Sequence, residues 1–284
     1  MSQMQLLIVC VDDRLIGVPC EYVRELLHPN NAHETPVPGL KAPFKGVLSQ
    51  RGPTLPLMDL RALLGLKTFE EQHADLKALL AAREQDHVDW LNDLRECCHS
   101  GAEFQKATDP HKCAFGKWYD GLRSSQEALS ALTGNDKTLV YLVNQFDAPH
   151  KAIHGIAEEA LSLAKDGKLE ESTALIEEAW NKELGKMREL FAALIQGVED
   201  NRRMMYLVLD IGDEHLACVV DESQSLIRID SNDIQTVVAG GVAVHGVYPH
   251  QSEGNIMILD VEYVARLMQR DETKPLQLAD AASA

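Results

Sequence analysis

The sequence predicts an α+β protein of more than one domain, in which a bundle of helices interrupts a β-rich domain. Residues 1–66 contain short apolar, β-branched runs typical of strands. From Thr68 to Asn201 apolar residues instead recur at helical spacing, and strand-like runs return after Arg202. We therefore expect a β-rich part at 1–67, a helical part at 68–201, a second β-rich part at 202–272 and a disordered tail at 273–284.

Chain length favours one interrupted β domain over two separate ones. The 284 residues suffice for two domains with separate cores. Each β-rich part alone is of marginal size for a domain, whereas the two together have an ordinary size. A four-helix up-and-down bundle starts and finishes at the same end, so a loop can accept it with little strain.

The composition excludes several classes of function. The net charge of -17 argues against nucleic acid, whose phosphates need a basic surface, and against a polybasic membrane anchor. The amino-terminal apolar run lacks a basic region before it, and no stretch approaches the about 20 apolar residues of a membrane span. Six cysteines in such a chain are expected to be thiols, which indicates a cytoplasmic protein.

The β-rich parts are expected to be strands separated by short turns. Asp12-Asp13 begins a turn between the runs LLIVCV and RLIGVP, and a short helix is expected over residues 20–27. Two further strands flank Arg51-Gly52-Pro53, and RALLGL forms one helical turn. The second part predicts a closing helix over 261–268 and four strands, in MMYLVLDI, HLACVVDE, SLIRID and NIMILD.

Four amphipathic helices with short loops are predicted for the middle of the chain, an arrangement typical of a bundle. Pro149 falls inside the third stretch, so a kink or restart is expected there. The helical stretches cover residues 76–97, 113–131, 139–161 and 176–198.

His150 and His154 are candidate metal ligands. They are four residues apart, so their side chains leave one helix face one turn apart. An isolated HxxxH is more often a pair of ordinary histidines. Here both lie on the apolar stripe between Phe146 and Ala157, where burying an imidazole ring without a hydrogen-bond or metal partner would cost free energy.

His87 and Cys113 complete the set. His87 lies one heptad from apolar residues on either side and so points inward, although an ordinary core histidine would do the same. Asp109-Pro110 is interpreted as the cap and first turn of the helix that carries Cys113, so the helix dipole would favour its thiolate. One thiolate and three imidazoles form a complete tetrahedral ligand set for Zn²⁺.

Catalysis is not expected at such a site. A zincin motif needs a glutamate where HKAIH has Lys151, and a fourth protein ligand leaves no position for activated water. Cys97, Cys98, His99 and His111 lie nearby; His99 and His111 are interpreted as surface residues flanking the loop, although a different helix phase would let either replace a ligand. Asp86, Asp89 and Asp147 are either solvated acids or acceptors for ligand imidazoles.

The middle of the chain resembles the chemoreceptor zinc-binding (CZB) domain over roughly residues 72–165. The resemblance rests on His87, on Cys113-Ala-Phe-Gly-Lys-Trp-Tyr119 and on the pair His150 and His154. It implies that these four positions bind zinc and that the domain senses zinc or oxidants such as hypochlorous acid. The segment between Cys113 and His150 is longer here than in that family.

The flanking parts resemble the CheW domain, an adaptor that links chemoreceptors to the histidine kinase CheA. The resemblance rests on Val23 to Leu26 and Gly46 to Leu66, with looser agreement at Val219 to Asp221 and Leu259-Asp260. It implies two small SH3-like β-barrels. It also implies a surface that contacts receptor and kinase near Arg51, Gly52, Asp59 and Arg61. Of these, Asp59 and Arg61 could equally pair internally or cap the helical turn, whereas Arg51 beside a turn better fits a partner contact.

Three functions remain open from the sequence. The first is a cytoplasmic adaptor at chemoreceptor arrays, which is not an enzyme. Its expected partners are CheA and the cytoplasmic tips of the receptors, and its expected cofactor is Zn²⁺. A homodimer through the bundle is one possibility. In this adaptor, zinc occupancy or oxidation of the Cys113 thiolate would alter helix packing. The second is a constitutive scaffold in which zinc only staples the bundle. The third, which the sequence favours least, is a zinc hydrolase or thiol redox enzyme.

Overall fold

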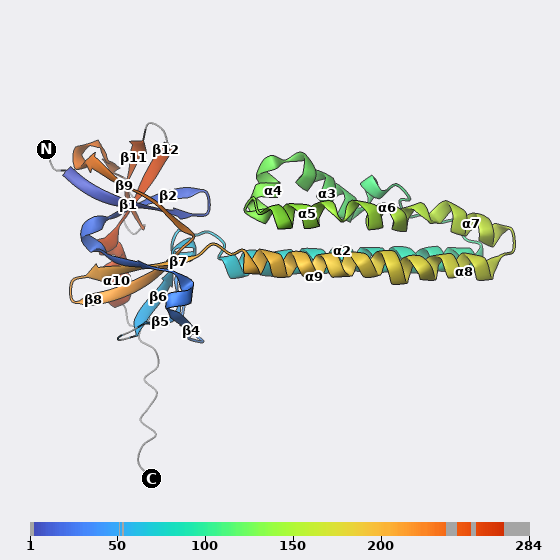
Figure 1. The fold of residues 1–284 in the computed structure, drawn as a ribbon, viewed down its shortest axis with the longest axis horizontal. Helices are drawn as coiled ribbons and strands as arrows, with labels where there is room; N and C mark the ends of the chain where they lie inside the picture. The colour runs from blue at the N-terminus through green and yellow to red at the C-terminus, as the bar shows by residue number, and fades with distance from the viewer. Residues whose placement is uncertain (1–2, 51, 53, 237–242, 251–253, 270–284) are drawn as a thin grey trace, which may run out of the picture. The chain divides into compact units, whose positions relative to one another are not determined.

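The computed structural model describes residues 3–50, 52, 54–236, 243–250 and 254–269. The chain divides into two compact units (Figure 1). The first consists of Met1–Thr68 and Arg203–Ala284, and the second of Phe69–Arg202. The protein therefore has an α+β composition in which the sheets and the long helices lie in different units.

The first unit contains two six-stranded sheets within the described residues. One sheet has the strand order β10-β11-β12-β2-β1-β9, and the other has the order β3-β7-β8-β6-β5-β4. The strands of the first sheet are β1 (Gln3–Val11), β2 (Arg14–Pro19), β9 (Glu222–Asp230), β10 (Gln235–Thr236), β11 (Val244–His250) and β12 (Gly254–Leu259). Those of the second are β3 (Val23–Leu27), β4 (His33–Pro36), β5 (Phe44–Ser49), β6 (Leu55–Asp59), β7 (Met205–Ile211) and β8 (Glu214–Val220).

Both sheets take strands from both β-rich parts of the sequence. Strand β1 pairs with β9, with Leu7 opposite Leu226, and β2 pairs with β12 in parallel. In the other sheet β6 pairs in parallel with β8, with Met58 opposite Cys218. Neither part can satisfy its backbone hydrogen bonds alone, so the unit needs both sides of the helical segment to fold.

Most of the predicted strands are confirmed, and one predicted helix is wrong. Residues 20–27 form a short 3-10 turn, η1 (Cys20–Tyr22), followed by β3. The sequence VRELL can be helical, but here it pairs with β7, so tertiary pairing overrides local propensity. The helical turn α1 (Leu60–Leu63) and the closing helix α10 (Val261–Gln269) are confirmed, whereas β4, β10 and β11 were not predicted. The predicted disordered tail at 273–284 lies outside the described residues.

Arg61 ties the two β-rich parts of the sequence together. Its guanidinium donates to both carboxylate oxygens of Asp221, at 3.0 and 2.6 Å, and to Asp12 at 3.3 Å. Only 13% of the Arg61 side chain is exposed. Next to it, the buried Asp59 caps α1 by accepting hydrogen bonds from the backbone N–H groups of Arg61 and Ala62.

Replacing Arg61 with alanine should lower the free energy of unfolding of the first unit by about 1–3 kcal/mol, because the partly buried Asp221 carboxylate loses both its guanidinium donors. Urea denaturation followed by circular dichroism would measure this. The matched control is Arg14→Ala, because the Arg14 ion pair with Asp13, at 3.9 Å, lies on an exposed turn. Equal effects of the two substitutions would contradict a structural role for Arg61.

The second unit begins with one long helix and returns through shorter ones (Figure 1). Its last helical run contains a six-residue π-helical segment, η4, directly before α9. The elements in order are α2 (Phe69–Ser100), η3 (Pro110–Lys112), α3 (Ala114–Ser124), α4 (Gln126–Thr133), α5 (Lys137–Asn144), α6 (Asp147–Gly155), α7 (Ala157–Lys165), α8 (Leu169–Glu178), η4 (Ala179–Leu184) and α9 (Gly185–Asp200). Two 3-10 turns of the first unit, η2 (Pro29–Asn31) and η5 (Ser231–Asp233), complete the element set.

Two of the four predicted helical stretches are subdivided. The predicted helix over 113–131 consists of α3 and α4, separated by Ser125, whose hydroxyl caps α4. The stretch over 139–161 consists of α5, α6 and α7. Helix α6 begins at Asp147, so Pro149, which has no N–H to donate, lies in its first turn, where N–H groups lack helical partners in any case. This matches the predicted restart near Pro149.

The two ends of the helical unit are joined to each other. Arg202 bonds Glu70 at 2.9 Å and lies over the ring of Phe69. One turn further in, the imidazole of His73 contacts Glu199 at 2.7 Å and the Ile195 carbonyl at 3.1 Å. The chain therefore enters and leaves this unit at one end, as an insertion requires.

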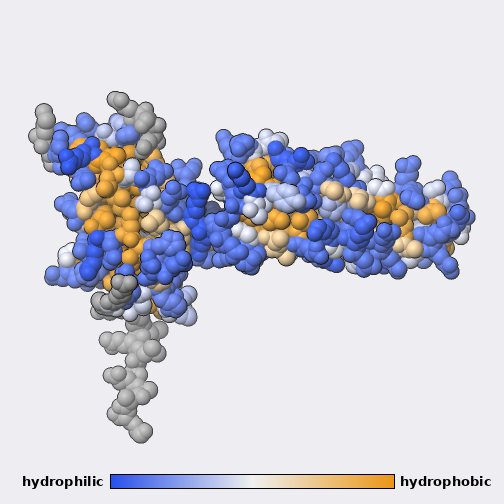
Figure 2. All heavy atoms as spheres, in the orientation of Figure 1, coloured by the Kyte–Doolittle hydropathy of each residue, from blue (hydrophilic) through white to orange (hydrophobic). Residues whose placement is uncertain are grey.

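Hydrophilic side chains cover most of the visible face of the helical unit, and hydrophobic ones appear in the seams between helices (Figure 2). Its core gathers apolar residues from α2 to α9, among them Leu91, Phe115, Phe146 and Leu194, each fully buried. None of the helices among the described residues combines the length and apolarity needed to cross a membrane.

Candidate metal centre

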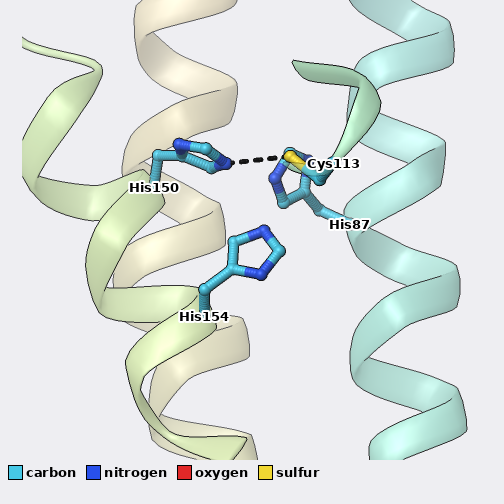
Figure 3. Close-up of side chains that lie close together, drawn as sticks. All are labelled: His87, Cys113, His150 and His154. Atoms are coloured by element: carbon cyan, nitrogen blue, oxygen red, sulfur yellow. Dashed lines mark hydrogen bonds between the residues drawn. The ribbon is translucent and has the colours of Figure 1, made fainter. Parts of the chain in front are cut away.

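The structure brings His87, Cys113, His150 and His154 together in the helical unit (Figure 3). One nitrogen or sulfur atom from each lies within 4.8 Å of the others. His87 comes from α2, Cys113 from the residue before α3, and His150 and His154 from α6. The histidines are only 2–3% exposed and Cys113 is half-buried, so the group lies inside the core.

Cys113 is held at the start of α3 by local backbone structure. Its Sγ accepts a hydrogen bond from the Gly116 N–H at 3.1 Å, so the cysteine itself caps the helix. The expectation that Asp109 caps this helix is wrong, because Asp109 instead caps the preceding 3-10 turn, η3. The prediction that Cys113 lies at a helix N-terminus is nevertheless confirmed, and this position favours a thiolate.

His87 presents one ring nitrogen to the group. Its Nδ1 contacts the backbone carbonyl of Arg83 at 2.7 Å, which requires the proton on Nδ1. Its Nε2 is buried and has no hydrogen-bond partner. A carbonyl that fixes the tautomer while leaving the other nitrogen free is the usual support for a metal-bound imidazole.

His150 and His154 supply further nitrogen ligands to the group. His150 Nε2 lies 3.2 Å from Cys113 Sγ. Both ring nitrogens of His154 are buried without a hydrogen-bond partner. Buried polar atoms are rarely left unpaired, so these nitrogens indicate a ligand. With Zn–N near 2.0 Å and Zn–S near 2.3 Å, tetrahedral donors lie about 3.3–3.6 Å apart, a spacing compatible with this group. The residues therefore fit Zn²⁺.

The electrostatics favour metal binding at neutral pH. Burial, followed by the neighbouring imidazoles of His87 and His154, lowers the pKa of His150 to about 3. Burial and His87 lower the pKa of His154 to about 4, and burial also lowers the pKa of His87. All three imidazoles are thus neutral and able to bind a cation. Burial raises the pKa of Cys113, so its thiol would lose a proton on metal binding.

The other candidate groups have partners elsewhere. Asp86 pairs with Arg83, Asp89 accepts from Gln85, and Asp147 accepts from Lys151. The group that accepts a hydrogen bond from His87 is instead the backbone carbonyl of Arg83, and a sequence motif contains no information about backbone groups. The remaining neighbours are similarly engaged: His99 with Thr173, His111 with Asp120 and Cys97 with the Glu103 carbonyl.

The candidate partner-binding residues are not gathered into one site by the described structure. Asp59 and Arg61 are engaged internally, as described above, and offer little free polar surface. Gly52 is exposed, and Arg51 lies outside the described residues.

Comparisons with known proteins match two stretches of the chain to family models. Residues 5–88 match the family model "CheW-like domain", and residues 87–161 match "Chemoreceptor zinc-binding domain", a range that contains all four clustered residues. No curated protein matches the chain. A solved structure, the scaffolding protein TtCheW from Thermoanaerobacter tengcongensis, aligns over 92% of this chain and 86% of its own, at 10% identity and a TM-score of 0.40.

Both family models describe signalling domains without catalytic activity, and the second is a zinc-binding domain whose range includes the metal-competent cluster. The chain therefore contains a CheW-like domain and a chemoreceptor zinc-binding domain, and with them the parts of a chemotaxis signalling scaffold.

Proposed function

We propose that this protein is a chemotaxis adaptor that couples chemoreceptor tips to the histidine kinase CheA, and that its helical unit binds zinc as a sensor. The observation that carries the proposal is the cluster of His87, Cys113, His150 and His154 inside the matched zinc-binding domain. Such an adaptor would work in the cytoplasm at receptor arrays.

The four side chains would hold the ion in a closed tetrahedral shell. When bound, zinc supplies a Lewis acid that organises four ligands, with no open position for water. The ligands come from α2, α6 and the residue before α3, so binding joins three elements of one core. This arrangement supports a binding and signalling role over hydrolysis.

Cys113 is the residue through which an oxidant would act. It is half-buried, whereas the three histidines are almost fully buried, so it is the ligand most open to small reagents. Oxidation of its sulfur would remove one ligand and loosen the contact between the start of α3 and α6. The chain joins α2 to α1 and α9 to β7 through short segments, and these two connections are the route along which a change in helix packing would be passed on.

The proposal assigns both β-rich parts to one adaptor domain. Residues 203–269 lie outside both family matches, yet their strands complete both sheets begun by residues 3–59. We assign residues 1–67 and 202–272 to the CheW-like domain, with its sheets as SH3-like barrels, and residues 68–201 to an inserted four-helix bundle.

The decisive experiment replaces Cys113 with alanine, with Cys97→Ala as the matched control in the same unit. Protein purified without added zinc should contain about one zinc per chain in the wild type and the control, and much less in Cys113→Ala. Kinase activity with CheA and receptor should respond to chelation in the wild type but not in Cys113→Ala. Unchanged metal content in Cys113→Ala would refute the site assignment.

A second function is favoured by the depth of the cluster. The ligands lie among core residues such as Phe115 and Trp90, so bound zinc could serve only to hold the helices together. In that case chelation would reduce the helical circular dichroism of the protein and leave kinase coupling unchanged. A response of the kinase at constant helical content would instead support the sensor.

A further inference from the structure

Trp90 connects three parts of the helical unit around the metal centre. It lies on α2 three residues after His87 and is only 4% exposed. Its ring centroid is 4.9 Å from that of His154, on α6. Its indole Nε1 donates to the carbonyl of Ala107 at 2.9 Å, and Phe104 packs edge-on against the ring at 5.2 Å.

Ala107 and Phe104 belong to the loop over residues 101–109 that leads to Cys113. This loop has no regular secondary structure, so it relies on contacts with α2 for its position. Besides Trp90, these contacts include the ion pair between Lys106 and Asp93 at 2.7 Å. The Lys106 and Asp93 side chains are 36% and 48% exposed, whereas the Trp90 bond is buried, so Trp90 should be the stronger attachment.

The ring of Trp90 also packs directly against the ring of His154. The two ring planes are inclined at 59°, and both side chains are almost fully buried, at 4% and 3% exposed. Neither ring nitrogen of His154 has a hydrogen-bond partner, so the contact with Trp90 helps to fix the orientation of this imidazole.

We propose that Trp90 is a positioning residue of the metal centre, which fixes the loop that delivers Cys113 and, through its ring contact, orients His154. This inference rests on the proposed zinc site. It gives one indole side chain two roles: its N–H anchors the loop that delivers Cys113, and its ring orients His154. It also makes Trp90 a built-in optical reporter of the site.

The first test is Trp90→Phe, which keeps an aromatic ring and removes the N–H donor. The matched control is Trp180→Phe, because Trp180 lies on η4, where its ring contacts the guanidinium groups of Arg95 and Arg188 at 5.8 and 5.9 Å. Competition with a chelating dye should show zinc binding weakened about 10–100-fold in Trp90→Phe and unchanged in the control. Equal affinity of the two variants would overturn the proposal.

Site-resolved alkylation of the chelated protein separates positioning from general destabilisation. Without metal, Cys113 in Trp90→Phe should react several-fold faster than in the wild type, because the loop opens more often. The reaction of Cys10, in the other unit, serves as the internal reference and should not change. An unchanged ratio of Cys113 to Cys10 reactivity would also overturn the proposal.

A third measurement keeps Trp90 intact and so does not depend on the folding of that variant. The chain has three tryptophans, and Trp118→Phe with Trp180→Phe leaves Trp90 alone. Its emission should change on zinc addition and return on chelation, and constant emission on saturation with zinc contradicts the inference. If the wild type binds no zinc, the proposed site itself fails. If the wild type binds zinc and Trp90→Phe binds it equally well, only the role of Trp90 fails.

Discussion

Gly116→Ala is expected to destabilise the helical unit by about 1–3 kcal/mol and to weaken zinc binding at least about tenfold. A Cβ at this position would lie 1.9 Å from the carbonyl oxygen of Pro110, which is a backbone atom with no freedom to rotate away. The loop before Cys113 would have to move off α3. That movement would also break the hydrogen bond from the Gly116 N–H to Cys113 Sγ. Thermal denaturation with and without zinc, together with the dye competition, would measure both effects.

Gly121→Ala is the matched control, because it lies in the same helix, α3, with no atom within 4 Å of the added Cβ. A glycine-to-alanine change in a helix interior normally stabilises by about 0.5–1 kcal/mol. We therefore expect the two substitutions to have opposite signs. A stabilising Gly116→Ala, or equal zinc affinities of the two variants, would show that the close approach of the loop to α3 is unimportant.

Acid should destabilise the metal-free helical unit over a defined pH range. The pKa of His150 is lowered to about 3 and that of His154 to about 4 in the folded protein, from an ordinary value of 6.5. Above pH 6.5 both states are neutral and the shifts have no effect. Below pH 6.5 the two histidines bind protons in the unfolded state but not in the folded state, so the free energy of unfolding falls as the pH drops. The loss between pH 7.5 and 5.5 should be on the order of 2–3 kcal/mol for the two residues together.

Urea denaturation of the chelated protein at several pH values in this range would measure the loss. The comparison protein is His150→Gln with His154→Gln, in which stability should depend much less on pH. His111→Gln, which replaces an exposed histidine paired with Asp120, should keep the wild-type slope. Parallel losses of stability in the wild type and the double variant would contradict a role for these two histidines.

Much of the metal cluster could be predicted from the sequence because its signal is local. Two histidines four residues apart share a helix face whatever the fold around them, and His87 lies in phase with the buried face of one long helix. The supports of the ligands were not predictable in this way. The Arg83 carbonyl that contacts His87 and the Ala107 carbonyl that accepts from Trp90 are backbone groups of a kind present in every residue, and only folding decides which of them meets a side chain of the site.

The strands also divide into those predictable from a local sequence signal and those decided by tertiary pairing. Runs such as LLIVCV and HLACVV carry their own β-branched and apolar signal, so their existence was predictable. The segment VRELL has helical propensity, but it becomes a strand because it pairs with β7, which comes nearly two hundred residues later in the chain. Likewise Arg61 could have faced a partner, but the fold brings Asp221 and Asp12 to its guanidinium.

The sequence by itself therefore determined that a helical, metal-competent segment separates two β-rich parts, because hydrophobic period and ligand spacing act over a few turns of chain. The tertiary structure alone decided that the two β-rich parts share both sheets, that Cys113 caps its own helix, and that Trp90 joins the thiol loop to His154. These features depend on hydrogen bonds and close contacts between segments far apart in the chain. Their partners are backbone atoms or common side chains, and the sequence carries no local mark of which ones will meet.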